Sequence, residues 1–437
     1  MAAGTWNTQN KVRPGVYVNF NSEPQTVGTV GERGITTIPL ALSWGEPGKV
    51  LALQAGADTT ALLGYPITAP QLVLVREALK RANTLLVYRV NTGVKAAATA
   101  GNLTVMAKWG GTRGNDLTVT IAGNIDNEEL FDVATRVDGV VADTQTVASI
   151  GGLVANDWVT FSGTGALTET AGTPLTGGSD GTVTNQNYTD YLTAIEVFDF
   201  NTMALPVTDN TLKALFVAFV KRLREEGKKI QVVVENYPQA DDEGVISVRN
   251  GVVLSDGASL TPAQCTAWVA GATAGAKLNE SLTYAAYDDA VDVTPRYTNS
   301  QIIDALKAGE FVFTANDNKA VVEQDINTLT SFTPEKGKAL AKNRVIRVLD
   351  GVNNDFVRIF SSFYLGKVSN NADGRNLLKN ECVKYLESLQ GMEAVQNFDS
   401  QTDIRIAQGN DGDSVYIESY VQPVDAIEKI YVKVTVG

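Results

Sequence analysis

An amphipathic helix followed directly by an apolar strand constrains the fold of this chain more than any other feature. Residues 208–229 place apolar side chains at helical spacing: Leu212, Leu215, Phe216, Phe219, Val220 and Leu223. Asp209 and Asn210 give a helix start signal, and a basic end followed by Gly227 gives a stop. The next segment, "IQVVVEN" at 230–236, is typical of a buried parallel strand. The pair therefore predicts a β-α-β unit within an α/β domain.

The same alternation of helix and strand occurs in two other places. The segment "APQLVLVREALKRAN" at 69–83 has helical spacing and leads into the apolar strand candidate "TLLVYRV" at 84–90. A helix that starts with proline is expected in "TPAQCTAWVAGATAGA" at 261–276. We therefore expect α/β structure over residues 25–96 and again over 189–333.

Residues 97–188 differ in composition from both flanking segments. They are rich in Thr, Val, Gly and Asp, and short alternating runs are bounded by turn residues. This pattern predicts a β-sandwich or small barrel inserted between α/β segments, with the glycine-rich stretch 177–181 as its exit linker. We expect the insert to project outward from the framework, because insertions are tolerated at surfaces.

The last hundred residues predict an α+β domain over residues 334–425. Strand and helix are both expected within 343–368, followed by a second good helix in 371–392 and closing strands within 414–436. Multidomain α/β and α+β structure is therefore the expected fold class.

Both ends of the chain alternate apolar and polar residues. Val16, Val18 and Phe20 share one face of a strand near the N-terminus, and the C-terminal segment alternates in the same way. Long unpaired strands of this kind invite other chains. Two alternatives remain: the strands pair within their own subunit, or they are donated to neighbours. The residues concerned are Val16, Tyr17, Val18, Asn19, Phe20, Ile430, Tyr431, Val432, Lys433, Val434, Thr435 and Val436.

Composition disfavours several classes of function. The chain has no histidine, which removes Ser-His-Asp and Cys-His catalysis and histidine-ligated metals. With a net charge of −13 and no basic block, direct nucleic-acid binding is disfavoured. Cys265 and Cys382 are expected to be reduced thiols. No signal sequence or membrane-spanning run is present, which predicts synthesis in a cytoplasm without membrane insertion.

Three loops carry glycines or carboxylates but lack the spacing of a ligand site. The segments 45–50 and 110–116 match neither phosphate-loop nor dinucleotide spacing, so their glycines predict turns. The segment 410–414 lacks the later oxygen ligands of a calcium site. We therefore expect no catalytic residue, no cofactor and no metal.

Several stretches together resemble the contractile tail sheath proteins of bacteriophages and related phage-tail-like particles, especially those of Gram-positive hosts. The resemblance extends over the whole chain in order, which is more specific than any one motif. It rests on "RPGVYVNF" (13–20), "GERGI" (31–35), "GGTRGNDLTVTI" (110–121), "AWVAGATAGAKLNESLT" (267–283), "GEFVFT" (309–314), "VEQDINTLTSFTPEKGKALAKNRVIRVLD" (322–350), "YLGKVSNNADGRNLLK" (364–379) and "VDAIEKIYVKVTV" (424–436).

The resemblance implies a structural sheath subunit that polymerises helically around a tail tube and contracts to drive it through a cell envelope. It implies a non-catalytic subtilisin-like middle domain over 189–333, an N-terminal arm over 1–24 and a C-terminal arm over 426–437. In such proteins, both arms add strands to the C-terminal domains of neighbours. Contraction would then shift nearly rigid bodies, with hinges expected at 21–26 and 421–425.

The resemblance also implies partners: further copies of the chain in stacked six-membered rings, a tail tube protein, and baseplate and tail terminator proteins. Arg375, Lys379 and Lys384 of the 374–390 helix are the candidate tube-facing residues, and a solvated helix face is the alternative. Either a phage virion or a genome-free particle fits the sequence, in either lattice state. The alternatives to a sheath are another self-assembling tube or capsid protein, or a subtilisin-like or nucleotide-binding α/β enzyme.

Overall fold

The computed structural model describes residues 2–4, 15–17 and 30–436 of the 437-residue chain. It contains two compact units, each described here by itself. The larger unit comprises residues 31–354 together with 423–437, and the smaller comprises 355–422 together with 1–30. Near the N-terminus, β1 (Ala2–Gly4) and β2 (Gly15–Tyr17) pair in parallel.

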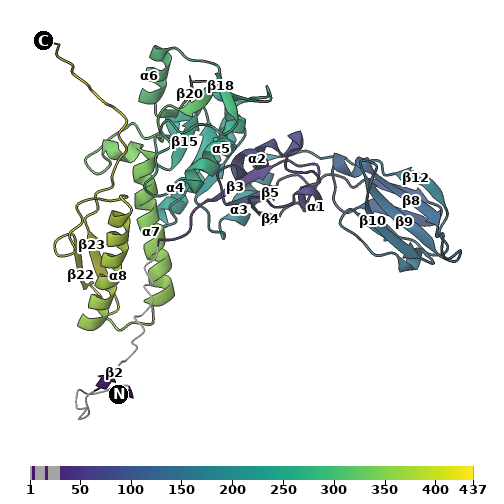
Figure 1. Ribbon diagram of the computed structural model, residues 1–437, viewed down its shortest axis with the longest axis horizontal. Coiled ribbons are helices and arrows are strands. Elements are labelled where there is room, and N and C mark those ends of the chain that lie inside the picture. The colour runs from purple at the N-terminus through teal and green to yellow at the C-terminus, as the bar shows by residue number, and fades with distance from the viewer. Residues whose placement is uncertain (1, 5–14, 18–29, 437) are drawn as a thin grey trace. The chain divides into compact units, whose positions relative to one another are not determined.

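A seven-stranded sheet forms the centre of the larger unit (Figure 1). All its strands are parallel except β4, which pairs antiparallel with β5 at one edge. In spatial order the strands are β19 (Glu310–Phe311), β15 (Val245–Val248), β14 (Gln231–Glu235), β13 (Thr202–Ala204), β3 (Ile35–Leu40), β5 (Thr84–Arg89) and β4 (Val50–Gln54).

Helices cover both faces of this sheet, which explains why its strands are apolar on both sides. On β14, Val233 packs into the core with α2 (Val73–Leu79) and α5 (Pro262–Gly275). Its neighbours Val232 and Val234 pack into the opposite core with α3 (Asn185–Ile195) and α4 (Asn210–Glu225). The predicted β-α-β unit is confirmed.

Local sequence explains how α4 and α5 begin. The Asp209 carboxylate caps α4 by accepting hydrogen bonds from the backbone N–H groups of Thr211 and Leu212. Thr261 and Gln264 form a capping box at the start of α5. Both helices lie within the segments that the sequence predicts.

Helix α5 lies unusually close to α2. A Cβ on Gly271 would stand 2.2 Å from the Ala78 carbonyl oxygen, and one on Gly275 would stand 2.0 Å from that of Arg81. Glycine is therefore required at both positions for the two helices to approach each other.

Smaller elements complete the larger unit. β16 pairs with β17 and β18, β20 pairs with β21, and short helices connect the strands. Their bounds are β16 (Gly251–Leu254), β17 (Ser259–Leu260), β18 (Ala290–Thr294), β20 (Phe313–Asn316), β21 (Lys319–Val322), α1 (Thr60–Leu63), α6 (Asn299–Lys307), η1 (Pro70–Leu72), η2 (Thr112–Asp116), η3 (Ile150–Gly152), η4 (Pro238–Ala240) and η5 (Lys338–Ala341).

The predicted all-β insert is a two-sheet sandwich. One sheet has the order β10-β9-β8-β12 and the other β11-β7-β6. Leu103, Val119, Val133 and Trp158 contribute to its shared core. The strands are β6 (Ala97–Ala100), β7 (Leu103–Ala107), β8 (Leu117–Gly123), β9 (Phe131–Val137), β10 (Val140–Val147), β11 (Val159–Ser162) and β12 (Thr170–Pro174).

The chain enters and leaves the sandwich through two paired linkers. Val94 and Ser179 exchange backbone hydrogen bonds of 2.8 and 3.2 Å. The buried Arg89 guanidinium donates to the carbonyl oxygens of Gly45 (2.7 Å) and Gly110 (2.6 Å) beside them. Burial lowers the Arg89 pKa to about 10. The sandwich is therefore joined to the sheet by a polar, ordered junction.

Helix α7 (Asn343–Phe363) belongs to both units, since the division falls after Asn354. The expectation that 343–368 contains a strand is wrong. Its valines and isoleucines are β-formers, but Val345, Val348 and Ile359 are all buried at helical spacing.

In the smaller unit, α8 (Ala372–Gly391) packs against a hairpin of β22 (Ile404–Gln408) and β23 (Val415–Ser419). The Tyr385 hydroxyl donates a 2.7 Å hydrogen bond to the Asp355 carboxylate. The helix α8 and the strand β23 lie in segments for which the sequence predicts them, whereas β22 lies before the predicted closing strands.

Candidate assembly surfaces

The linkers of the sandwich meet the carboxyl ends of β3 and β5 in the α/β sheet. In such sheets, ligands bind beyond the carboxyl ends of the strands where the strand order reverses, here next to β3. The Asn91 amide donates to the carbonyl oxygens of Leu42 (2.8 Å) and Asp180 (2.6 Å) at this place. The Asp180 carboxylate accepts from the Thr112 backbone N–H at 2.7 Å. These polar groups therefore hold the sandwich linkers.

No chemistry-bearing cluster stands out in the described part of the chain. Among residues 2–4, 15–17 and 30–436, no group of potential ligands could hold a metal ion. Cys265 and Cys382 are free and buried, and burial raises the pKa of both thiols, that of Cys382 to about 12. None of the described helices is both long and apolar enough to cross a bilayer.

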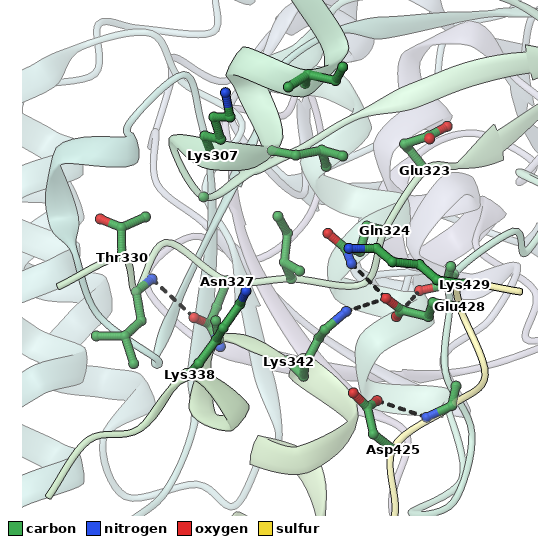
Figure 2. A pocket seen from close by; sticks show the side chains of 18 of the residues that line it. Lys307, Glu323, Gln324, Asn327, Thr330, Lys338, Lys342, Asp425, Glu428 and Lys429 are labelled. Atoms are coloured by element: carbon green, nitrogen blue, oxygen red, sulfur yellow. Dashed lines mark hydrogen bonds and ion pairs between the residues drawn. The ribbon is translucent and has the colours of Figure 1, made fainter. Parts of the chain in front are cut away.

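A groove of the larger unit encloses about 980 Å³ beside the last segment of the chain (Figure 2). Its walls come from α6, the segment after β21, η5 and residues 425–429. Apolar side chains line much of it: Ile303, Leu306, Ile326, Leu329 and Phe332. Lysines 307, 338, 342 and 429 also contribute to the lining.

Glu428 connects the C-terminal segment to this groove. Its carboxylate pairs with the Lys342 ammonium and accepts hydrogen bonds from the Gln324 amide (2.6 Å) and the Thr283 hydroxyl (2.9 Å). Figure 2 shows Lys342 and Gln324 pointing at Glu428 from separate segments. The Glu428 side chain is only 11% exposed, and these three donors lower its pKa against the opposing effect of burial.

The C-terminal segment beyond Glu428 lies in solvent. Ile430, Val432, Val434 and Val436 are 78 to 90% exposed, and residues 424–436 form no strand within the chain. Among the described residues, positions 429–436 make no hydrogen bond or ion pair. Within the described part of the chain, no strand pairs with this segment, so the predicted strand does not form in the single subunit.

The N-terminal candidates are described only in part. The backbone of Val16 and Tyr17 lies in β2, paired with β1, while Val18, Asn19 and Phe20 lie outside the described residues. The hinge expected at 21–26 also lies outside them, whereas 421–425 includes the passage from the smaller unit to the larger after Gln422.

The β22–β23 hairpin has two strands and, within the described part of the chain, no third. Tyr416 on β23 is 58% exposed. An antiparallel pair of this kind presents unpaired N–H and C=O groups along each outer edge. The outer edges of the hairpin are therefore candidate acceptors for an added strand.

The three basic residues of α8 do not share one face. Arg375 and Lys379 are four residues apart and lie on adjacent positions of the helix surface. Lys384 lies about 180° around the helix from Arg375, at 100° per residue. Arg375 also donates to the Asn370 carbonyl and side-chain oxygens at 3.3 and 2.9 Å, whereas Lys384 is exposed. They therefore cannot form a single contact surface.

Sequence reasoning missed the Glu428 cluster. Its four members come from segments that are distant in the sequence, so no spacing rule links them. One signal was present in the sequence. In an extended strand, Glu428 would lie on the same face as Ile430 and Val432, where an acidic residue is unexpected among apolar ones.

Four family profiles match successive parts of the chain. They are the N-terminal region of tail sheath protein Gp18 domain III (residues 33–90), the phage tail sheath β-sandwich domain (91–180), the phage tail sheath central domain (181–328) and the phage tail sheath C-terminal domain (335–437).

Individual relatives agree with the profiles. The phage-like element PBSX protein XkdK of Bacillus subtilis is 41% identical over the full length of both chains. A crystal structure of a sheath tail protein from Desulfitobacterium hafniense is 69% identical, with a TM-score of 0.88 over 96% of this chain and 99% of that one. A Listeria innocua sheath tail protein is 39% identical, with a TM-score of 0.81 over 93% and 96%.

A more distant structure shares the fold. The helical sheath of the anti-feeding prophage in its contracted state is 13% identical, with a TM-score of 0.59 over 97% of this chain and 99% of that one. The four profiles, which together cover residues 33–328 and 335–437, and the sheath tail protein of Desulfitobacterium hafniense name a single family. The chain belongs to the phage tail sheath protein family.

Proposed function

We propose that this chain is the sheath subunit that polymerises helically around a tail tube and contracts to drive the tube through a bacterial cell envelope. The observation that carries the proposal is the C-terminal arm. Its large apolar side chains are exposed and have no partner strand among the described residues: Ile430, Tyr431, Val432, Val434 and Val436. An arm of this kind is suited to pairing with a second copy.

The neighbour's β22–β23 hairpin is the proposed acceptor. It can take a strand on each outer edge, which suits one N-terminal and one C-terminal arm. Val16–Phe20 and Ile430–Val436 are the proposed donated residues. Contacts between unlike surfaces build rings where the rotation closes and helical tubes where it does not, and both kinds of contact are part of the proposed lattice. Contraction would shift nearly rigid bodies while these strands stay paired.

A structural role without catalysis is part of the proposal. The sheet covered by helices on both faces supports a subtilisin-like central domain, but without histidine the triad of that fold cannot form. Polar groups beyond the carboxyl ends of β3 and β5 are also engaged with the linkers of the sandwich.

The proposed partners are further copies in stacked six-membered rings, a tail tube protein, and baseplate and tail terminator proteins. The solved relatives support this class of assembly, because they include a contracted helical sheath and a baseplate of the anti-feeding prophage. The proposed location is the tail of a virion or of a phage-tail-like particle, after synthesis in the bacterial cytoplasm.

Negative-stain electron microscopy of the purified chain tests the proposal. Wide hollow tubes are expected at high protein concentration. Closed shells would favour a capsid protein, and dispersed monomers that hydrolyse a peptide, ester or nucleotide panel would favour an enzyme. A second test uses the tube protein: co-assembly should give tubes of uniform inner diameter.

A further inference from the structure

We propose that Glu428 is a positioning residue that fixes the root of the C-terminal arm, so that the free part of the arm begins at Lys429. This inference rests on the proposed function of the arm as a donated strand. It concerns where the arm leaves the subunit and how far it reaches.

The contacts of Glu428 support a fixed point. Its two carboxylate oxygens together receive three donors from three separate segments of the larger unit: Thr283, Gln324 and Lys342. Lys342 is itself 18% exposed, so the ion pair is shielded from water and salt on both sides. A single surface ion pair would not hold a chain segment in this way, but three converging donors do.

The segments that supply the donors are themselves tied together. The Thr283 hydroxyl accepts a hydrogen bond of 3.0 Å from the Asp325 backbone N–H, and Ile326 forms a β-bridge with Lys342. The carboxylate therefore binds to a preformed cluster.

Solvent exposure changes at Glu428 and shows where the unanchored part of the arm begins. Ala426 and Glu428 are half-buried, whereas every residue from Lys429 to Val436 is exposed. Eight extended residues span roughly 26 Å at about 3.3 Å each. The anchor therefore limits which neighbouring hairpin the arm can reach, and it places the flexible boundary after Glu428 rather than in 421–425.

Charge exchange across the Lys342–Glu428 pair tests the inference on the full chain. Lys342→Glu and Glu428→Lys each place like charges together, and the double variant restores an opposite pair. A spin label attached to Ile430→Cys reports the mobility of the arm. Both native cysteines are buried, so the label attaches to the introduced cysteine. Assembly is measured on unlabelled protein by sedimentation. Glu128→Lys, on an exposed loop of the sandwich, is the control for the charge change.

Each single exchange is expected to make the arm more mobile, which narrows the electron paramagnetic resonance lines of the label. It is also expected to raise the critical concentration for tube formation several-fold. The double exchange should reverse both effects in part, because it restores the ion pair but not the two hydrogen bonds from Thr283 and Gln324. A simple loss of subunit stability would not be reversed in this way. The inference is overturned if the label is equally mobile in all variants, or if the double variant stays as mobile as the singles. A chain ending at Lys429 that still forms tubes would refute the donated strand instead, while leaving the mobility result standing.

Discussion

At the scale of single residues, buried ion pairs join separate segments of the larger unit. The Arg224 guanidinium on α4 forms two hydrogen bonds, of 2.7 and 2.9 Å, with the Asp350 carboxylate on α7. Both side chains are about nine-tenths buried. The Lys213–Glu235 pair is similarly enclosed. Each pair stabilises only while both partners are present, because an unpaired buried charge is costly.

Removal of one partner should therefore have a large effect. Asp350→Ala leaves the Arg224 guanidinium buried without its carboxylate and is expected to lower the free energy of unfolding by about 3 kcal/mol. Glu226→Ala removes an exposed partner of Arg222 and should cost less than about 1 kcal/mol. Urea denaturation followed by circular dichroism measures both. If both variants lose the same free energy of unfolding, the Arg224–Asp350 pair is no more important to stability than an exposed pair.

Asp241 should contribute to stability in a pH-dependent way. Hydrogen bonds from Ser331 and Thr330 lower the pKa of its carboxyl from 3.8 to about 2. The contribution is complete above pH 4 and is lost as the pH falls toward 2, since the lowered pKa favours the charged form. In Asp241→Asn, the fall in urea midpoint between pH 4.5 and 2.5 should be smaller than in the parent chain. Asparagine tolerates the positive φ of 45° here, so the backbone is not strained. If the urea midpoint falls equally in both chains, Asp241 is not a source of the pH dependence.

At the scale of elements, sequence periodicity predicted the structure where one physical signal dominated. Apolar spacing and a capping residue located α4 and α5, and alternating Thr- and Val-rich runs located the sandwich. In α7, Val345 and Val348 suggested a strand, but burial along a helical stripe decided the outcome. The Glu428 cluster was not predictable, because its members meet only through the tertiary fold.

The sandwich can be removed at its paired linkers. Since Val94 and Ser179 exchange hydrogen bonds, a short Gly/Ser linker can replace residues 95–178. We expect the remainder to fold at a lower melting temperature, because Arg89 loses the Gly110 acceptor and Trp44 loses its contact with Trp158. Tubes should still form with a smaller outer diameter in electron micrographs. A folded variant that no longer assembles would show that the sandwich is a lattice element rather than an outward decoration.

The two sides of α8 can be tested separately as tube contacts. Lys384→Glu is expected to weaken co-sedimentation with tail tubes at low salt, because this exposed lysine is free of the local contacts that hold Arg375. The effect should disappear at high salt, as expected for screened charges. Arg375→Glu combined with Lys379→Glu is the comparison. If only the combined variant loses tube binding, the contact lies on the side of Arg375 and Lys379. If neither variant loses tube binding, α8 is a solvated surface.

At the scale of the whole molecule, the proposed lattice depends on a separation between folding and assembly. The cores of the sheet and the sandwich are built from residues that precede the arm. The exposed arm contributes no hydrogen bond beyond Glu428 among the described residues. Stability of the subunit and assembly of the tube should therefore respond to different substitutions.

A chain that ends at Lys429 keeps the Glu428 anchor and loses only the free arm. It is expected to melt at the temperature of the parent chain and to remain unassembled. Val432→Pro should behave similarly, because proline removes a backbone donor and disfavours a paired strand. Val432→Thr keeps the donor and the β-branched shape, so it should form tubes of normal width. Thermal melting by circular dichroism, sedimentation and electron microscopy separate the outcomes. Tubes from both the truncated and the proline variants would show that the arm is not donated. A large fall in melting temperature in either would show that the arm belongs to the core of its own subunit.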